Sequence, residues 1–235
     1  MARKRDYLVE ILEKRSRLHR RSHRFEQFKM RFSPIWDAYE FLRVHGKQVP
    51  HVRAELLKYI SIGIVACLEG YFRTVIRDLI DAGPPYQDNV RKLEEIRLDL
   101  GTVVGMGREK ISPGEFISHL LPLSSLDDIN RHMTTIMGAD FLDVIKRVPD
   151  PRTGDTIAEI AGGIFEQIRT AFRQRHIFCH ELAPKVQPTL RMEREILGSC
   201  LLLIVTTEFL VYPILQDGTL VPTGMRMREQ LSNEA

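Results

Sequence analysis

The chain has few of the residue patterns that build β-sheets. No alternation of apolar and polar residues is sustained, and no Asn-Gly or Asp-Gly pair joins two such runs as a hairpin turn would. Apolar residues instead recur at helical spacing along most of the 235 residues. The sequence therefore predicts an all-α protein.

Cysteine is also scarce, and long apolar runs are interrupted. Three cysteines with no close pair, Cys67, Cys179 and Cys200, exclude a disulfide scaffold and predict reduced, buried thiols in a cytoplasmic protein. The basic N-terminus lacks the apolar stretch of a secretory signal. The longest apolar run, residues 197–215, contains polar residues and a proline, which favours a buried bundle helix over a membrane span.

Signatures of bound cofactors are missing as well. Gly105-Met106-Gly107 has neither a preceding strand nor the Lys-Ser/Thr pair of a phosphate-binding loop, and no Gly-x-Ser-x-Gly nucleophile motif occurs. His176 and His180 are spaced as a zinc pair can be, but no third or fourth ligand is evident. We therefore expect neither a cofactor nor a metal.

Positive charge gathers at the N-terminus. The whole chain has a net charge of only +3, yet residues 1–31 hold eleven Lys and Arg against four Asp and Glu, a local charge of +7. Arg20, Arg21 and Arg24 lie in this segment and are candidates for contacts with an RNA backbone. The alternative is an ordinary solvated helix face.

Glycine and proline divide the chain into helical segments. The expected segments are a basic N-terminal helix over 4–44, with Ser33-Pro34 as a candidate break, a helix over 51–82, an insert of shorter helices over about 84–150, and helices over 155–174 and 190–212. Together they predict a single domain over 1–235, an up-and-down helical bundle with a helical insert.

The segment around residue 175 combines the groups that phosphodiester chemistry needs. Arg175 supplies a permanent cation, and His176 and His180 can carry or release a proton near neutral pH. On one straight helix, Arg175 and His180 would point roughly 140° apart. They converge only if the chain turns between them or if two copies each supply a pair. Alternatively, Arg175 caps the helix and His180 bonds a backbone carbonyl.

Glu69 interrupts an otherwise apolar helix. An unpaired buried carboxylate is costly, so Glu69 should face solvent or meet a cation. Arg175 is one candidate partner, and Arg73, four residues further along the same helix, is the other.

These two segments resemble the HEPN superfamily. Arg175-His176-xxx-His180 is similar to its R-x4-6-H signature, and Leu56 to Phe72, with Glu69 before Gly70 and two aromatics, is similar to its long core helix. The resemblance covers about residues 51–82 and 155–212. It implies a helical bundle, commonly dimeric. Many such proteins are metal-independent endoribonucleases of toxin–antitoxin, phage-defence or RNA-processing systems.

The resemblance also implies roles for the residues. The RNA 2′-hydroxyl would attack the adjacent phosphate, His180 would move a proton, Arg175 would neutralise developing charge, His176 would orient the phosphate, and Glu69 would support the site. RNA, a second copy and a cognate antitoxin or defence protein are the expected partners. The alternative is a non-catalytic HEPN-like module that binds a partner protein or RNA, or a helical protein unrelated to the family.

Overall fold

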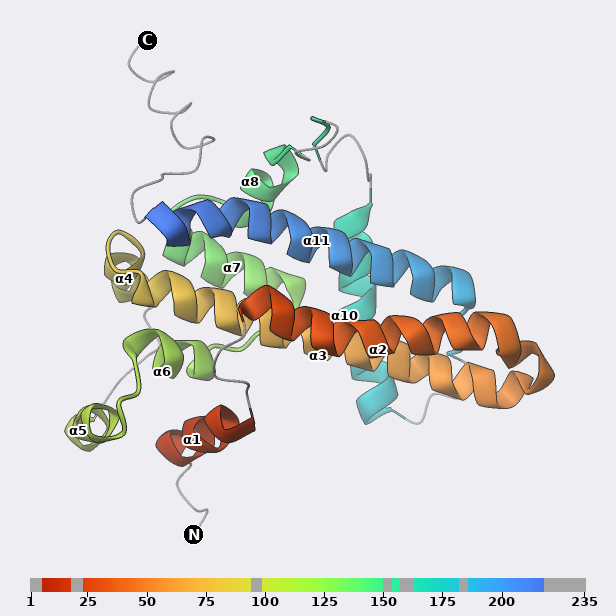
Figure 1. The fold of residues 1–235 in the computed structure, drawn as a ribbon, viewed down its shortest axis with the longest axis horizontal. Helices are drawn as coiled ribbons and strands as arrows, with labels where there is room; N and C mark the ends of the chain where they lie inside the picture. Colours follow the sequence, from red (N-terminus) through yellow and green to blue (C-terminus); the bar gives the residue numbers. More distant parts are fainter. Residues whose placement is uncertain are drawn as a thin grey trace.

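The protein is helical throughout the part that the structure describes. The computed structural model describes residues 6–17, 23–93, 99–149, 154–156, 163–181 and 186–217. Within these ranges no strand occurs, and the only β-type pairing is an isolated bridge between Pro149 and Thr156. The all-α prediction is confirmed, and the long helices form a bundle (Figure 1).

The N-terminal region has two helices where one over 4–44 was expected. α1 (Tyr7–Arg17) ends well before α2 (Arg24–His45), and α2 continues through Pro34. His23 caps α2, since its ring accepts a hydrogen bond from the Phe25 amide at 3.3 Å. A proline inside a helix costs about 3 kcal/mol. Packing outweighs this here because α2 buries apolar side chains on both sides of Pro34: Phe28, Phe32, Tyr39 and Leu42.

α3 (Pro50–Asp81) is the central helix. Proline at its first turn and Gly83 just beyond its end, with a φ of 93°, are the start and stop signals that the sequence predicts. α2, α6, α10 and α11 all pack against it. Its buried residues recur at helical spacing from Leu57 to Ile80 and form one broad face toward these helices.

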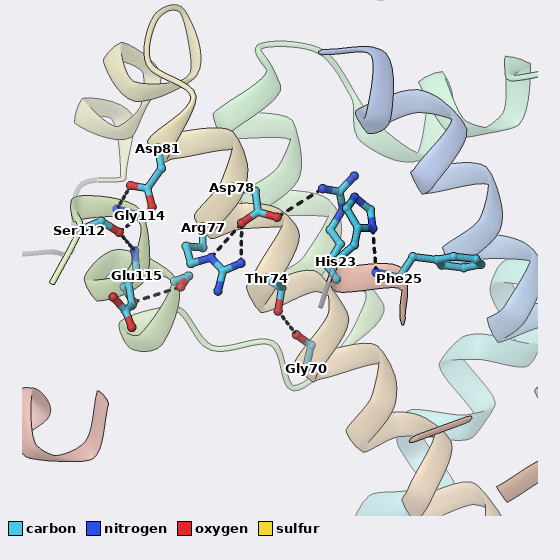
Figure 2. Close-up of polar contacts among 12 residues, drawn as sticks. His23, Phe25, Gly70, Thr74, Arg77, Asp78, Asp81, Ser112, Gly114 and Glu115 are labelled. Carbon is cyan, nitrogen blue, oxygen red and sulfur yellow. Dashed lines mark hydrogen bonds and ion pairs between the residues drawn. The ribbon is translucent and has the colours of Figure 1, made fainter. Parts of the chain in front are cut away.

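Short helices occupy the expected insert. They are α4 (Tyr86–Asn89), the 3-10 helix η2 (Val90–Lys92), α5 (Leu100–Glu109), α6 (Pro113–Leu120), α7 (Leu126–Met137) and α8 (Phe141–Arg147). α6 lies very close to α3. A Cβ atom on Gly114 would collide with the Arg77 carbonyl oxygen, at less than 3.0 Å. The Asp81 carboxylate accepts hydrogen bonds from the Ser112 hydroxyl and the Gly114 amide at this contact (Figure 2).

The two C-terminal helices differ from expectation at their ends. α10 (Ile164–His180) begins after Gly163, which has a φ of 94°, and not at Asp155; residues 157–162 lie outside the described ranges. It also runs past 174 to His180. α11 (Leu190–Asp217) continues through Pro213, where Ile214 remains in the core. In Figure 1, α11 runs along α3 whereas α10 crosses it steeply.

Among the residues that the structure describes, two helices are long and apolar enough to cross a membrane by length and composition alone. They are α3 and residues Leu190–Gln216 of α11, with mean hydropathies of 1.4 and 1.8 in their most apolar windows. In each case 56% of that window is buried inside the protein. Core helices of soluble bundles satisfy the same criteria, so these two helices are weak evidence for a membrane location.

Candidate phosphodiester site at the end of α10

A buried hydrogen bond joins α10 to α3 just before the last turns of α10. Gln174 is buried, and its Oε1 accepts a hydrogen bond from the Ser61 hydroxyl at 2.9 Å. Beyond Gln174 the helix leaves the core, since none of the residues from 175 to 180 is buried. The last turn and a half of α10 therefore presents its side chains at the surface with a defined orientation.

Arg175 is the first residue past this point, and it pairs with Glu69 of α3. The Arg175 Nη2 and Glu69 Oε1 atoms are 3.5 Å apart, with 32% and 25% of the two side chains exposed. Burial raises the pKa of Glu69, and the nearby cations Arg175 and Arg73 oppose that rise. Of the two predicted partners, Arg175 is therefore the one that reaches Glu69.

Arg73 points instead to the C-terminal end of α6. Its Nη1 donates to the carbonyl oxygens of Ser118, His119 and Leu121, the latter two at 3.1 and 3.3 Å. These carbonyls lie at or just beyond the end of α6 and lack partners within that helix. Arg73 is thus a capping residue for α6 that also adds positive charge next to Glu69.

His176 and His180 lie together on the exposed face of α10. Their ring centroids are 5.1 Å apart and the ring planes are inclined by 48°. Neither imidazole forms a hydrogen bond with the described part of the chain. Both rings are therefore available to bind a ligand or transfer a proton.

Arg175 and His180 do not converge within one chain. α10 is continuous from Ile164 to His180, so the two side chains leave the helix roughly 140° apart. This excludes the alternative in which the chain turns between them. The arrangement in which two copies complete one site stays a prediction.

Cys179 was expected to be buried, and it is exposed. Cys67 and Cys200 do lie in the core, and burial raises the pKa of the Cys67 thiol to about 11. The reason for the difference is that α10 has left the core by residue 179. Within the described ranges, no group of three His, Cys, Asp or Glu side chains is arranged to hold a metal ion.

Arg24 does not lie on a basic surface, which corrects the expectation that it contacts RNA. It is 6% exposed, and its Nη2 donates to Glu208 Oε2 of α11 at 2.9 Å. Its Nη1 donates to Asp78 at 3.3 Å, and Asp78 also accepts from Arg77 (Figure 2). The two carboxylates hold the guanidinium in the core. Arg20 and Arg21 lie outside the described residues.

A second buried polar cluster supports α10 and was not predicted. Glu193 of α11 is fully buried, and both of its carboxylate oxygens lie within 2.9 Å of the Ser61 hydroxyl. Burial raises the pKa of Glu193 to about 7, and the Ser61 hydrogen bond opposes that rise. In the sequence, each of these residues appears as a polar residue among apolar ones. The sequence alone does not show that they contact one another.

Comparison with protein-family models, curated proteins and solved structures found no match for this chain.

Proposed function

We propose that the protein is a metal-independent endoribonuclease of the HEPN type that acts as a homodimer. The observation that carries the proposal is Arg175, oriented by Glu69 at the open end of α10, with the His176–His180 pair on the neighbouring face of the same turns. Arginine binds phosphate oxygens through its planar fork, and histidine transfers protons near neutral pH. Both groups are partly or fully exposed to a polymer substrate.

The chemistry follows from these two groups. The 2′-oxygen of the RNA attacks the adjacent phosphorus, and a histidine accepts the hydroxyl proton. The bond from phosphorus to the 5′-oxygen breaks as a second histidine donates a proton to that oxygen. The products are a 2′,3′-cyclic phosphate and a 5′-hydroxyl. Arg175 stabilises the extra negative charge on the phosphate oxygens during the reaction.

A second copy of the chain completes the site in this proposal. Arg175 and His180 diverge on one helix, so a two-fold axis near the end of α10 would let each copy contribute a cation and a histidine pair. Large apolar side chains also remain exposed on α2 and the start of α3, including Phe41 at 62% and Tyr59 at 59%. Contact with a second copy would remove such groups from water.

The setting implied by the resemblance is a toxin–antitoxin, phage-defence or RNA-processing system in the cytoplasm, with RNA as the substrate. An antitoxin or another component of a defence system would then be a further partner. These roles share one cleavage chemistry, so the test of the site is the same for all of them.

The test is cleavage of a mixed RNA pool in excess EDTA by wild type and by His180→Ala, Arg175→Ala and Arg175→Lys. His51→Ala, an exposed histidine at the start of α3, is the matched control. We expect the wild type and the control to cleave, and His180→Ala to lose a factor of about 10²–10⁴. Arg175→Lys should recover little, because an ammonium does not reproduce the planar fork. Substrates with a 2′-deoxynucleotide at the cleaved position should resist.

The composite site is tested by mixing two inactive variants. A heterodimer of Arg175→Ala and His180→Ala retains one arginine and one histidine from different copies, so mixing should restore part of the activity. Equal cleavage by folded His180→Ala and wild type would place the chemistry elsewhere. If wild type cleaves no RNA, the non-catalytic HEPN-like interaction module replaces the nuclease.

A further inference from the structure

A small cavity with a strong excess of positive charge lies between α1, α3 and α6, one helical turn along α3 from Glu69. Its volume is about 30 Å³, and it is partly open to solvent. Four of its nine lining residues are lysine or arginine and one is glutamate. The lining consists of Ile11, Lys14, Arg15, Arg73, Thr74, Arg77, Glu115, Ser118 and His119.

Most charges around this cavity have partners. Arg15 Nε donates to Glu115 Oε1 at 2.6 Å, which neutralises the only carboxylate of the lining. Arg77 donates from Nε and Nη2 to Asp78 at 2.8 and 2.6 Å (Figure 2). His119 contacts the carboxylate of Glu10 at 2.8 Å. Arg73 caps the C-terminal end of α6.

Lys14 is the exception. Its ammonium group forms no hydrogen bond or ion pair with the residues that the structure describes, although the side chain is half-buried. Burial, together with the positive charges of Arg73 and Arg77, lowers the pKa of Lys14 to about 8, and the negative charge of Glu115 only partly opposes that fall. A partly desolvated cation that faces two others is unfavourable unless a negative ligand joins them.

We propose that this cavity binds one tetrahedral oxyanion, a phosphoryl group or inorganic phosphate, with the Lys14 ammonium as its principal donor and Arg73 and Arg77 as flanking cations. Each guanidinium keeps N–H groups that its hydrogen bonds to the described residues leave unused. A volume of about 30 Å³ is on the scale of two water molecules. The cavity therefore suits the oxygens of one phosphate and not a nucleoside.

The close contact between α3 and α6 gives the cavity a fixed shape. Gly114 has no room for a Cβ atom against the Arg77 carbonyl, and Asp81 bonds the Gly114 amide. Arg73 stabilises the C-terminal end of α6 through hydrogen bonds to backbone carbonyl oxygens there. The flanking cations are thus in place before any anion arrives, which lowers the entropic cost of binding. The proposal goes beyond ribonuclease activity and does not depend on it.

Binding of inorganic phosphate and of sulfate is measured by isothermal titration calorimetry on the full chain. Lys14→Met removes the charge and keeps the side-chain length, whereas Lys14→Arg keeps the charge. We expect Lys14→Met to weaken binding roughly 10- to 100-fold, the value of one charge-assisted hydrogen bond. Lys14→Arg should bind within a few-fold of wild type, as should the control Lys47→Met, which alters an exposed lysine on η1 (Gly46–Gln48).

The pH dependence with sulfate provides a second measurement, because sulfate does not itself titrate in this range. Affinity should fall as the pH rises through about 8, where Lys14 loses its proton. The other charged groups at the cavity are Arg73 and Arg77 of α3, Glu115 and His119 of α6, and Glu10 and Arg15 of α1. Lys14→Met should remove the fall in affinity near pH 8.

The source of the anion is distinguished by competition. A short oligoribonucleotide with a 5′-phosphate, and the same strand with a 5′-hydroxyl, are titrated against bound phosphate. Displacement only by the phosphorylated strand identifies an RNA end as the ligand, and displacement by neither strand identifies free phosphate. Equal displacement by both strands through Lys14 would identify internal phosphates. Failure of wild type to bind phosphate or sulfate, or equal binding by folded Lys14→Met, overturns the proposal whether or not the protein cleaves RNA.

Discussion

Replacing Glu193 by glutamine should stabilise the protein at neutral and alkaline pH. The Glu193 carboxyl is fully buried and bonds the Ser61 hydroxyl, which also lies 2.9 Å from Gln174 Oε1. One hydroxyl proton cannot satisfy an ionised carboxylate and Gln174 together. A protonated Glu193 can donate to Ser61, which then donates to Gln174. The side-chain amide introduced by Glu193→Gln would occupy the same space and donate in the same way.

The size of the effect follows from linkage. Burial raises the pKa of Glu193 to about 7, from a value of 4.5 when unperturbed. Because the folded-state pKa is the higher one, this group gives full stability below about pH 4.5 and loses it as the pH rises through 7. At 1.36 kcal/mol per unit, the loss is about 3 kcal/mol above pH 8. Glutamine does not titrate, so the variant escapes this loss.

The assay is urea unfolding of wild type and Glu193→Gln at a series of pH values from about 5 to about 8.5. The difference in free energy of unfolding should grow from about 1 kcal/mol at pH 5 to about 3 kcal/mol at pH 8.5, in favour of the variant. Glu195→Gln is the control, since Glu195 lies two residues away on α11 in a surface pair with Arg191. Its effect should stay below about 0.5 kcal/mol at every pH. A constant difference for Glu193→Gln, or a loss of stability at pH 8, would refute the reasoning.

Three other sets of substitutions test the fold and the basic segment. Arg24→Gln should destabilise the protein by about 3–5 kcal/mol in thermal or urea unfolding, because the buried Glu208 carboxylate loses its cation and Asp78 keeps only Arg77. If the basic segment contacts RNA, changing both Arg20 and Arg21 to Gln should reduce the salt dependence of binding by about one counterion per lost phosphate contact, without loss of stability. Gly114→Ala should cost about 1–3 kcal/mol by overpacking. Gly70→Ala, in open space on α3, should instead stabilise by about 1 kcal/mol in the same unfolding assay.

Helical periodicity predicted the all-α class, and the local start and stop signals predicted the central helix α3. Pro50 and Gly83 fix α3 locally, so its bounds were predictable to within one residue. The end of α10 and the continuation of α2 through Pro34 were not predictable. Both depend on tertiary packing, about which the local sequence carries no information. The separate start of α2 at Arg24, after the His23 cap, was missed because the apolar stripe continues across this point in the sequence.

The pairing of Glu69 with a cation could also be inferred from the sequence, whereas the burial of Arg24 could not. An apolar helix that contains Glu69 needs a cation, and Arg175 was one of two candidates. The burial of Arg24 was hidden because its partners, Asp78 and Glu208, lie 54 and 184 residues away. A segment rich in charged residues is predicted to be exposed, and its composition does not reveal that one of its arginines is buried.

The buried cluster of Ser61, Gln174 and Glu193 bears on the site through geometry, because it joins α10 to α3 and α11. An apolar contact between α10 and α3 would permit several rotations of α10 at similar energy, whereas the hydrogen bond from Ser61 to Gln174 is satisfied in one. Arg175 follows Gln174 directly, so that rotation decides whether its guanidinium reaches Glu69. Buried polar groups of this kind add little stability compared with apolar residues of the same size. Our hypothesis is that their contribution here is orientation: they direct the arginine on an exposed helix end and leave the two histidines free at the surface.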